Sequence, residues 1–158
     1  MQEFPQLVIG LGTGRCGTQS LAVLLNHQSG ARVTHERYGA IAWQGDEQRV
    51  AAFVHLCATA PGLDLAGDVG FYYLPYVEQI LELVASTRFV CLKRDRQATV
   101  HSYLTKTRHK NHWIQHDGSE WRFDAWDRCY PKYAVTDKAE AIGMYWDEYY
   151  SRAAALES

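Results

Sequence analysis

The stretch that decides the fold is QLVIGLGTGRCGTQSL, residues 6–21. Its first part, Gln6–Leu11, is apolar almost throughout and predicts a strand buried on both faces, as in a parallel sheet. Glycines at positions 10, 12, 14 and 17 then predict a tight turn whose backbone a ligand can approach closely. Leucines at positions 21, 24 and 25 have helical spacing, so the turn leads directly into a helix. The amides at the start of that helix, with Arg15 beside them, favour an anion.

The turn differs from a Walker A phosphate loop in one respect. Gly12 and Gly17 have the Walker spacing, but Thr18 and Gln19 follow where that motif has a lysine and a hydroxyl residue. An ordinary ATPase, GTPase or kinase needs the lysine on the β- and γ-phosphates and the hydroxyl on magnesium. The turn therefore either binds another phosphate-containing ligand, to which Thr18 and Ser20 offer hydroxyls, or is a glycine-rich turn without a ligand.

Strand and helix patterns alternate along the rest of the chain. Strands are predicted at 31–36, 62–70 and 88–95, and helices after Asp46, near Pro75, from Asp95 to about Thr107, and from about Asp137. This alternation predicts a three-layer α/β fold with a parallel sheet of about four to five strands and helices on both faces. Ligands of such sheets bind beyond the carboxyl ends of the strands, where the glycine turn falls.

Composition limits the class of protein. A chain of 158 residues, 47% of them hydrophobic, predicts a single domain over 1–158, with 108–136 as an irregular, aromatic-rich insertion. Sixteen Lys and Arg against 18 Asp and Glu argue against nucleic-acid or membrane partners, which usually attract a basic surplus. Four cysteines without paired spacing predict reduced thiols. With no apolar run near ~20 residues and no leader before the first strand, we expect a cytoplasmic protein.

A second motif, KRDRQATVHS at residues 93–102, begins at the end of a predicted strand and enters a helix. Arg94 and Ser102 are eight residues apart across this junction, so both can reach a phosphate that lies over the helix start. The alternative is that Arg94 pairs with an acid and that Ser102 is solvated.

The two motifs together resemble those of the sulfotransferases that use 3′-phosphoadenosine-5′-phosphosulfate (PAPS). GTGRCGTQSL is similar to the family's 5′-phosphosulfate loop, and Arg94 with Ser102 to its 3′-phosphate site. The resemblance covers about residues 6–107, and AIGMYWDEYYSRA looks like the family's later aromatic helix. It implies a single sulfotransferase-like domain with a P-loop NTPase-like fold. Relatives commonly continue past this helix and this sequence stops at Ser158, as expected of a compact member or a fragment.

The resemblance also implies a set of ligands. The donor would be PAPS and the product 3′-phosphoadenosine-5′-phosphate (PAP), with no metal, and the acceptor a hydroxyl or amine of a small molecule or glycan. Arg15 stands where many relatives have lysine. Arg94 and Ser102 would bind the 3′-phosphate. The residues implied on the 5′ side are Gly14, Arg15, Cys16, Gly17, Thr18, Gln19 and Ser20.

The acceptor needs a base, and VTHE at the end of the second strand offers two. Several sulfotransferases use a glutamate at this place, so the resemblance favours Glu36 first and His35 second. Alternatively, one of the pair only forms a hydrogen bond within its loop. Asp68, at the end of the third strand, is a weaker candidate for the base or for positioning the acceptor.

The insertion contains further candidates. His109, His112 and His116 have a spacing that would face one side of a helix and bind zinc, but the irregular pattern favours solvated or acceptor-lining histidines. The aromatic residues between Trp113 and Tyr133 either line an acceptor pocket or pack the last helix onto the sheet.

Two other functions stay open. A divergent small-molecule kinase would share the strand–turn–helix unit but lacks the Walker lysine. A non-catalytic module that binds PAP would share both motifs without the chemistry.

Overall fold

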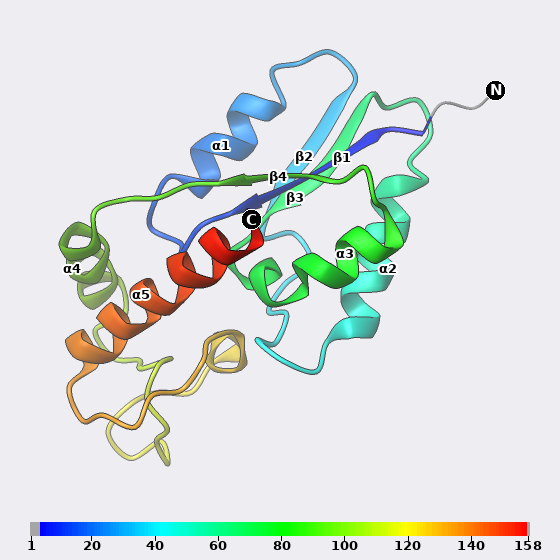
Figure 1. Ribbon diagram of the computed structural model, residues 1–158. Helices are drawn as coiled ribbons and strands as arrows, with labels where there is room; N and C mark the ends of the chain where they lie inside the picture. Colours follow the sequence, from blue (N-terminus) through cyan, green and yellow to red (C-terminus); the bar gives the residue numbers. More distant parts are fainter. Residues whose placement is uncertain (1–3, 158) are drawn as a thin grey trace.

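The structure is a computed structural model that describes residues 4–157. Four parallel strands form one sheet in the order β2-β3-β1-β4 (Figure 1). The fold is therefore α/β with an all-parallel sheet, as predicted. The strands are β1 (Gln6–Leu11), β2 (Ala31–His35), β3 (Leu65–Val69) and β4 (Arg88–Cys91).

Helices cover both faces of the sheet (Figure 1). The chain runs from β1 outward to β2 and then back through β3 to β4. Right-handed crossovers in opposite directions place their helices on opposite faces. Accordingly α1 packs on one face, and α2, with α3 against it, packs on the other. The helices are α1 (Thr18–Leu25), α2 (Glu47–Ala58), α3 (Val77–Leu83), α4 (Arg96–Lys106) and α5 (Lys138–Leu156), with short 3-10 helices η1 (Phe71–Tyr76) and η2 (Ala125–Cys129).

Strand β1 is buried on both sides, which explains its continuous apolar run. Leu7, Ile9 and Leu11 belong to the large core beneath α2 and α5, whereas Val8 packs with Ala22 beneath α1. Successive side chains of a strand point to opposite faces, so both faces of β1 need apolar residues.

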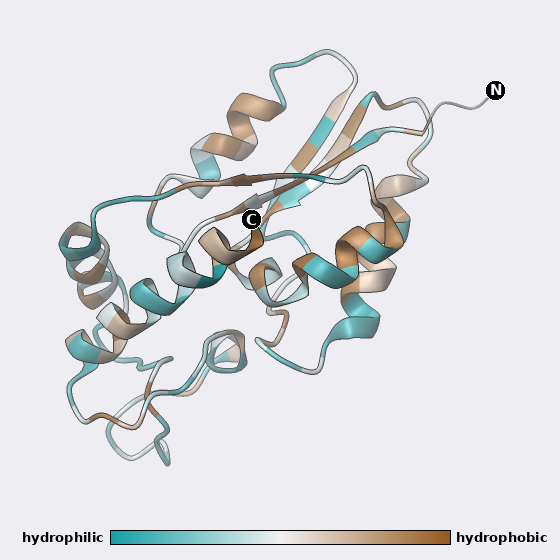
Figure 2. Ribbon diagram, viewed as in Figure 1, coloured by the Kyte–Doolittle hydropathy of each residue, from teal (hydrophilic) through white to brown (hydrophobic). Residues whose placement is uncertain are grey.

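Helix α1 is covered with apolar residues over much of its surface (Figure 2). Its buried residues are Thr18 and Ala22, while Leu24 is 64% exposed. Leu24 lies about 200° around the helix from Ala22, so both cannot face the sheet. The helical spacing of the leucines thus predicted the helix correctly but does not show which of them faces the sheet.

Strand β4 is shorter than the predicted 88–95. Its neighbour β1 ends at Leu11 and turns into the glycine loop, so the ladder stops after the Leu92 amide donates to the Leu11 carbonyl. The chain then crosses to α4, whose first turn is capped by Asp95, as predicted. The Asp95 carboxylate accepts from the Ala98 amide at 2.8 Å.

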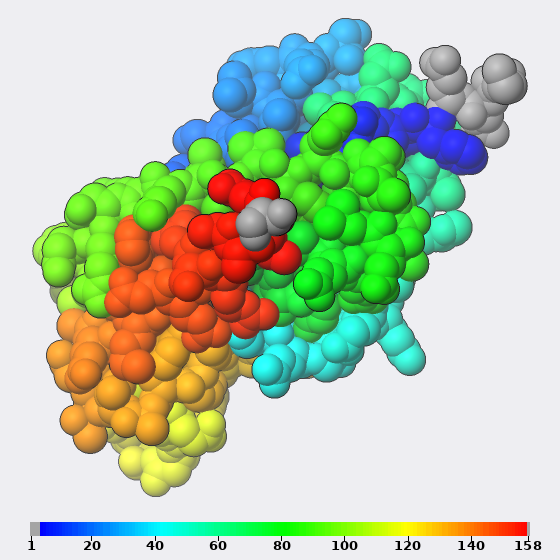
Figure 3. All heavy atoms as spheres, in the orientation of Figure 1, coloured from blue at the N-terminus to red at the C-terminus, as the bar shows by residue number. Residues whose placement is uncertain are grey.

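The segment 108–136 is irregular, as predicted, apart from η2. Together with the start of α5 it forms one end of the molecule (Figure 3). The buried Lys138 fastens the segment, because its ammonium group donates to the Thr107 carbonyl and lies over the Trp121 ring. Among residues 4–157, no helix combines the length and apolar character needed to cross a bilayer.

Candidate functional site

Hydroxyl groups of buried tyrosines form hydrogen bonds with the backbone of the glycine loop from its core side. The carbonyl of Thr13 accepts from Tyr103 Oη at 2.6 Å and from Tyr145 Oη at 3.0 Å. The hydroxyl of Tyr149 accepts from the Gly12 amide at 3.0 Å. All three tyrosines are buried, so these hydrogen bonds fix the loop against the core.

The sequence indicates the burial of these tyrosines but not their hydrogen-bond partners. Tyr145 and Tyr149 are four residues apart, a spacing that places both on one face of a helix, and both are buried. Helical spacing says nothing about which backbone groups their hydroxyls reach, because the loop lies more than 130 residues away.

The loop contains a conformation that requires glycine. Gly14 has a φ of 81°, and a Cβ added there would lie 2.2 Å from Tyr103 Oη. The next residue, Arg15, also has a positive φ, of 56°. Within residues 4–157, Arg15 and Glu36 are the two non-glycine residues with positive φ. Such strained backbone is concentrated at functional sites, and both of these residues are predicted catalytic residues.

The second motif meets the first at Arg15. The Nε of Arg15 donates to Ser102 Oγ at 3.0 Å, and Arg94 Nη1 donates to the Arg15 carbonyl at 2.9 Å. Arg94 and Ser102 are 79 and 87 residues from Arg15 in the sequence. Two motifs predicted separately therefore form one cationic and hydroxyl-bearing cluster at the carboxyl end of the sheet.

The start of α1 is open to an anion. Its N-cap is Gly17, which has no side chain to bind the first amides of the helix. Gln19 and Ser20, in the first turn, are exposed. The thiol of Cys16 is directed inward instead, since a Cβ at Gly12 would lie 2.6 Å from its Sγ. Burial raises the pKa of this thiol, which keeps it protonated.

The predicted bases lie at the end of β2, beside the loop. The Glu36 amide donates to the Val69 carbonyl at 3.0 Å, which holds the turn against β3. His35 Nε2 lies 3.0 Å from Thr18 Oγ1 and 3.8 Å from Glu36 Oε1. His35 thus contacts both the loop helix and Glu36.

The carboxyl group of Glu36 has an unusual affinity for protons. Burial, together with the negative charge of Asp68, raises its pKa to about 7, although Arg15 opposes the shift. Burial lowers the pKa of His35 despite Asp68, so this imidazole is mostly neutral at pH 7. A carboxyl group with a pKa near neutrality is suited to take and return a proton.

Asp68 has a structural role in this geometry. Its carboxylate is fully buried and accepts from Thr34 Oγ1 at 2.6 Å and from Tyr73 Oη at 2.7 Å. These bonds tie β2 and η1 to the end of β3. Asp68 does not line the cavity described next, and its charge raises the pKa of Glu36 and opposes the lowering of the pKa of His35.

A cavity of about 290 Å³ lies between the loop, the end of β2 and the irregular segment. Of the predicted residues, Gly14, Arg15, Thr18, His35 and Glu36 line it, whereas Arg94 and Ser102 lie outside. The other lining residues are Phe71, Tyr103, Lys106, Thr107, Lys110, His112, Asp124, Trp126 and Tyr130. Of these, sequence reasoning pointed to His112 and, as aromatic residues of the irregular segment, to Trp126 and Tyr130.

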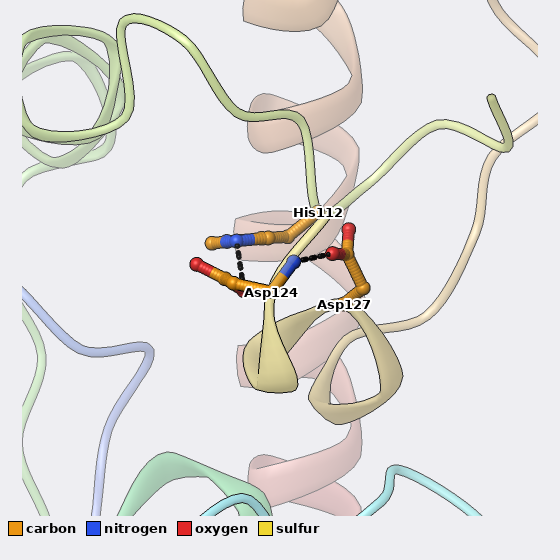
Figure 4. Close-up of side chains that lie close together, drawn as sticks. All are labelled: His112, Asp124 and Asp127. Carbon is orange, nitrogen blue, oxygen red and sulfur yellow. Dashed lines mark hydrogen bonds and ion pairs between the residues drawn. The ribbon is translucent and has the colours of Figure 1, made fainter. Parts of the chain in front are cut away.

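Next to the cavity, His112, Asp124 and Asp127 bring possible metal ligands within 4.8 Å of one another (Figure 4). His112 Nε2 lies 3.0 Å from Asp124 Oδ1, and Lys110 Nζ lies 2.5 Å from Asp124 Oδ2. Asp124 also caps η2 in a capping box with Asp127. His112 Nε2 and both Asp124 oxygens are thus engaged with each other or with a cation, whereas His112 Nδ1 and Asp127 Oδ1 have no hydrogen-bond partner among the described residues. The capping box accounts for the positions of the two aspartates without a metal.

The helical arrangement that would let His109, His112 and His116 bind zinc, which the sequence pattern disfavoured, is absent from the described residues. The three histidines are not on a helix, and His109 is exposed. His116 Nδ1 accepts from the Gly118 amide, so in the neutral ring Nε2 carries the proton and faces Asp127 Oδ1 at 3.5 Å. His112 lines the cavity, in agreement with the acceptor-lining alternative.

The aromatic residues of the segment divide between the two roles considered. Trp113 is fully buried against Tyr103 and Tyr145 and belongs to the core. Trp126 and Tyr130 line the cavity.

The sequence matches no protein-family model, and no curated protein is significantly similar to it.

Proposed function

We propose that this protein is a PAPS-dependent sulfotransferase with a P-loop NTPase-like arrangement, acting on a hydroxyl or amine of a small molecule or glycan. The observation that carries the proposal is the meeting of Arg94 and Ser102 at Arg15. A nucleotide with two phosphate-bearing positions could place one at the glycine loop and the other at Arg94 and Ser102 beside it. The sequence resemblance supports the same conclusion.

The residues present fit the 5′ end of this donor. The first amides of α1 have no side-chain cap, and the missing Cβ of Gly14 lets the loop backbone pack directly against the Tyr103 hydroxyl. The Arg15 guanidinium can bind an oxyanion through two parallel N–H groups. Arg94 and Ser102 would bind the 3′-phosphate, and Gln19 and Ser20 lie exposed near the helix start.

The chemistry needs a base on the acceptor and a cation on the leaving group. PAPS would supply the sulfuryl group and leave as PAP. Glu36 would accept the proton of the attacking hydroxyl as its oxygen bonds to sulfur, and a pKa of about 7 suits that transfer near neutral pH. Arg15 would stabilise the charge that develops on the departing phosphate, as a fixed cation but not as a proton donor.

His35 would act as a positioning residue. It lies between Thr18 at 3.0 Å and Glu36 at 3.8 Å, so it can hold the Glu36 carboxylate toward the loop. A sulfuryl group carries less charge than a γ-phosphoryl group, so one cation with helix-end amides can replace the Walker lysine and magnesium.

The proposal is tested by thermal-shift titration with PAP, with ATP plus magnesium, and with GTP. A ligand that binds the folded state adds about 2.7 kcal/mol to the free energy of unfolding at 100 times its Kd. The melting temperature rises as a result. We expect PAP to stabilise the protein and magnesium–ATP not to. Stabilisation by magnesium–ATP alone would contradict the proposal and favour the kinase. PAP binding without transfer to any acceptor would favour the binding module.

A further inference from the structure

The cavity beside the glycine loop contains more positive than negative charge. Its cationic side chains are Arg15, Lys106 and Lys110, and its acidic ones are Glu36 and Asp124. Lys110 is neutralised by Asp124 at 2.5 Å. The side chain of Lys106, in the last turn of α4, is exposed and forms no hydrogen bond or ion pair with any other described residue, although the chain as a whole has a net charge of −2.

The proposed donor would use only one of these cations. Its leaving phosphate would be held by Arg15, at the loop end of the cavity. Lys106 ends α4, one turn beyond Ser102, and lines the cavity beside Thr107 and Lys110, where the chain enters the irregular segment. One uncompensated ammonium group is therefore left on the part of the cavity where an acceptor would lie.

The same part of the cavity is lined by aromatic rings. Phe71 stacks on Tyr130 at 4.5 Å between ring centroids, and Trp126 lies 6.0 Å from Phe71. Trp126 is only half-buried, so part of its ring is available to a ligand. A cavity of about 290 Å³ is small for a ligand site and suits one ring with its substituents.

We propose that the acceptor is a ring compound that carries a carboxylate or sulfate group, held by Lys106, with its ring against Trp126. This inference rests on the proposed function and adds its substrate class. The anionic group meets the ammonium, the ring packs on the aromatic residues, and the reacting hydroxyl points to Glu36. A neutral ring would leave Lys106 without a partner and would bind less tightly.

The test compares matched acceptors in the presence of PAP by calorimetry and with PAPS by initial rates. Aromatic arms are 4-hydroxybenzoate, 4-hydroxyphenyl sulfate and the neutral methyl 4-hydroxybenzoate. Sugar arms are glucuronic acid, glucose 6-sulfate and glucose. We expect the anionic members of one set to bind at least tenfold more tightly than its neutral member. The set that shows this difference identifies the ring as aromatic or as a sugar.

Lys106→Gln then tests the residue itself, with Arg108→Gln as the matched control. Arg108 is exposed, carries the same charge two residues away and does not line the cavity. Lys106→Gln should raise KM for the anionic acceptor about tenfold, as expected for one hydrogen bond to a charged group. It should leave kcat, the KM for the neutral acceptor and the affinity for PAP unchanged. Arg108→Gln should change none of them.

The outcomes separate the two proposals. If the wild-type protein does not bind PAP, the proposed function fails, and this inference fails with it. If PAP binds but neutral acceptors bind as tightly as anionic ones, only the substrate class is wrong. The same holds if Lys106→Gln and Arg108→Gln raise KM equally, because the effect would then be one of overall charge.

Discussion

The hydroxyl of Tyr149 offers a direct test of how α5 holds the glycine loop. The side chain is 0% exposed, accepts from the Gly12 amide at 3.0 Å and donates to the Phe71 carbonyl at 2.9 Å. Tyr149→Phe removes the hydroxyl and keeps the ring, so packing in the core changes little.

The cost follows from what the substitution leaves behind. The Gly12 amide and the Phe71 carbonyl each lose a partner in a buried environment. An unsatisfied buried polar group costs about 1–3 kcal/mol. We therefore expect the free energy of unfolding to fall by about 2–4 kcal/mol, with the carbonyl contributing the smaller part because it has a second lone pair.

The assay is urea unfolding, followed by tryptophan fluorescence and circular dichroism. Tyr72→Phe is the matched control: Tyr72 is also 0% exposed, but its hydroxyl has no hydrogen-bond partner among the described residues. Removing that hydroxyl should leave stability unchanged or raise it slightly. The midpoint should fall for Tyr149→Phe alone, with an unchanged dependence on denaturant.

One result would refute this reasoning. If Tyr149→Phe costs no more than Tyr72→Phe, the loop does not depend on the hydroxyl, and its position is set by packing and backbone conformation alone. Proton exchange of the Gly12 amide gives a second reading, because it should become faster only in Tyr149→Phe.

Three further predictions concern the loop and the base. In urea unfolding, Gly14→Ala should lower the free energy of unfolding more than Gly62→Ala. Both glycines have a positive φ, but of the two only Gly14 has a neighbour within 4 Å of the added Cβ. Equal losses of stability would exclude the clash with Tyr103. The matched change at Gly62 should cost about 1–2 kcal/mol. Arg94→Ala should weaken PAP binding about tenfold, which calorimetry measures, and unchanged affinity would remove Arg94 from the site. Glu36→Gln should keep PAP binding and lower kcat at least about 100-fold. In the wild type, kcat/KM should rise with pH through about 7, as Glu36 loses its proton, and this rise should disappear in the variant. Folding raises the pKa of Glu36 from 4.5 to about 7, so between these pH values the folded protein binds more protons than the unfolded chain. The free energy of unfolding should therefore fall as pH increases across this window. Glu36→Gln should abolish that part of the decline.

Local patterns predicted those parts of this protein that depend on near neighbours. The apolar run at Gln6–Leu11, the buried stripe of α2 and the cap at Asp95 were all readable, because each reflects spacing within one or two turns. The order of strands and helices followed from the same patterns. Candidate site residues could be named because they belong to short motifs that follow or end predicted strands, as Arg15, Glu36 and Arg94 do.

The tertiary structure decided how those pieces meet. Strand β4 stops at Cys91 only because its partner turns away at Leu11, and a strand's length depends on its neighbour. The meeting of Ser102 with Arg15 spans 87 residues, and the pKa of Glu36 depends on burial and on the charge of Asp68. Hydrogen bonds and desolvation act through space over a few ångströms, so no pattern along the chain contains them.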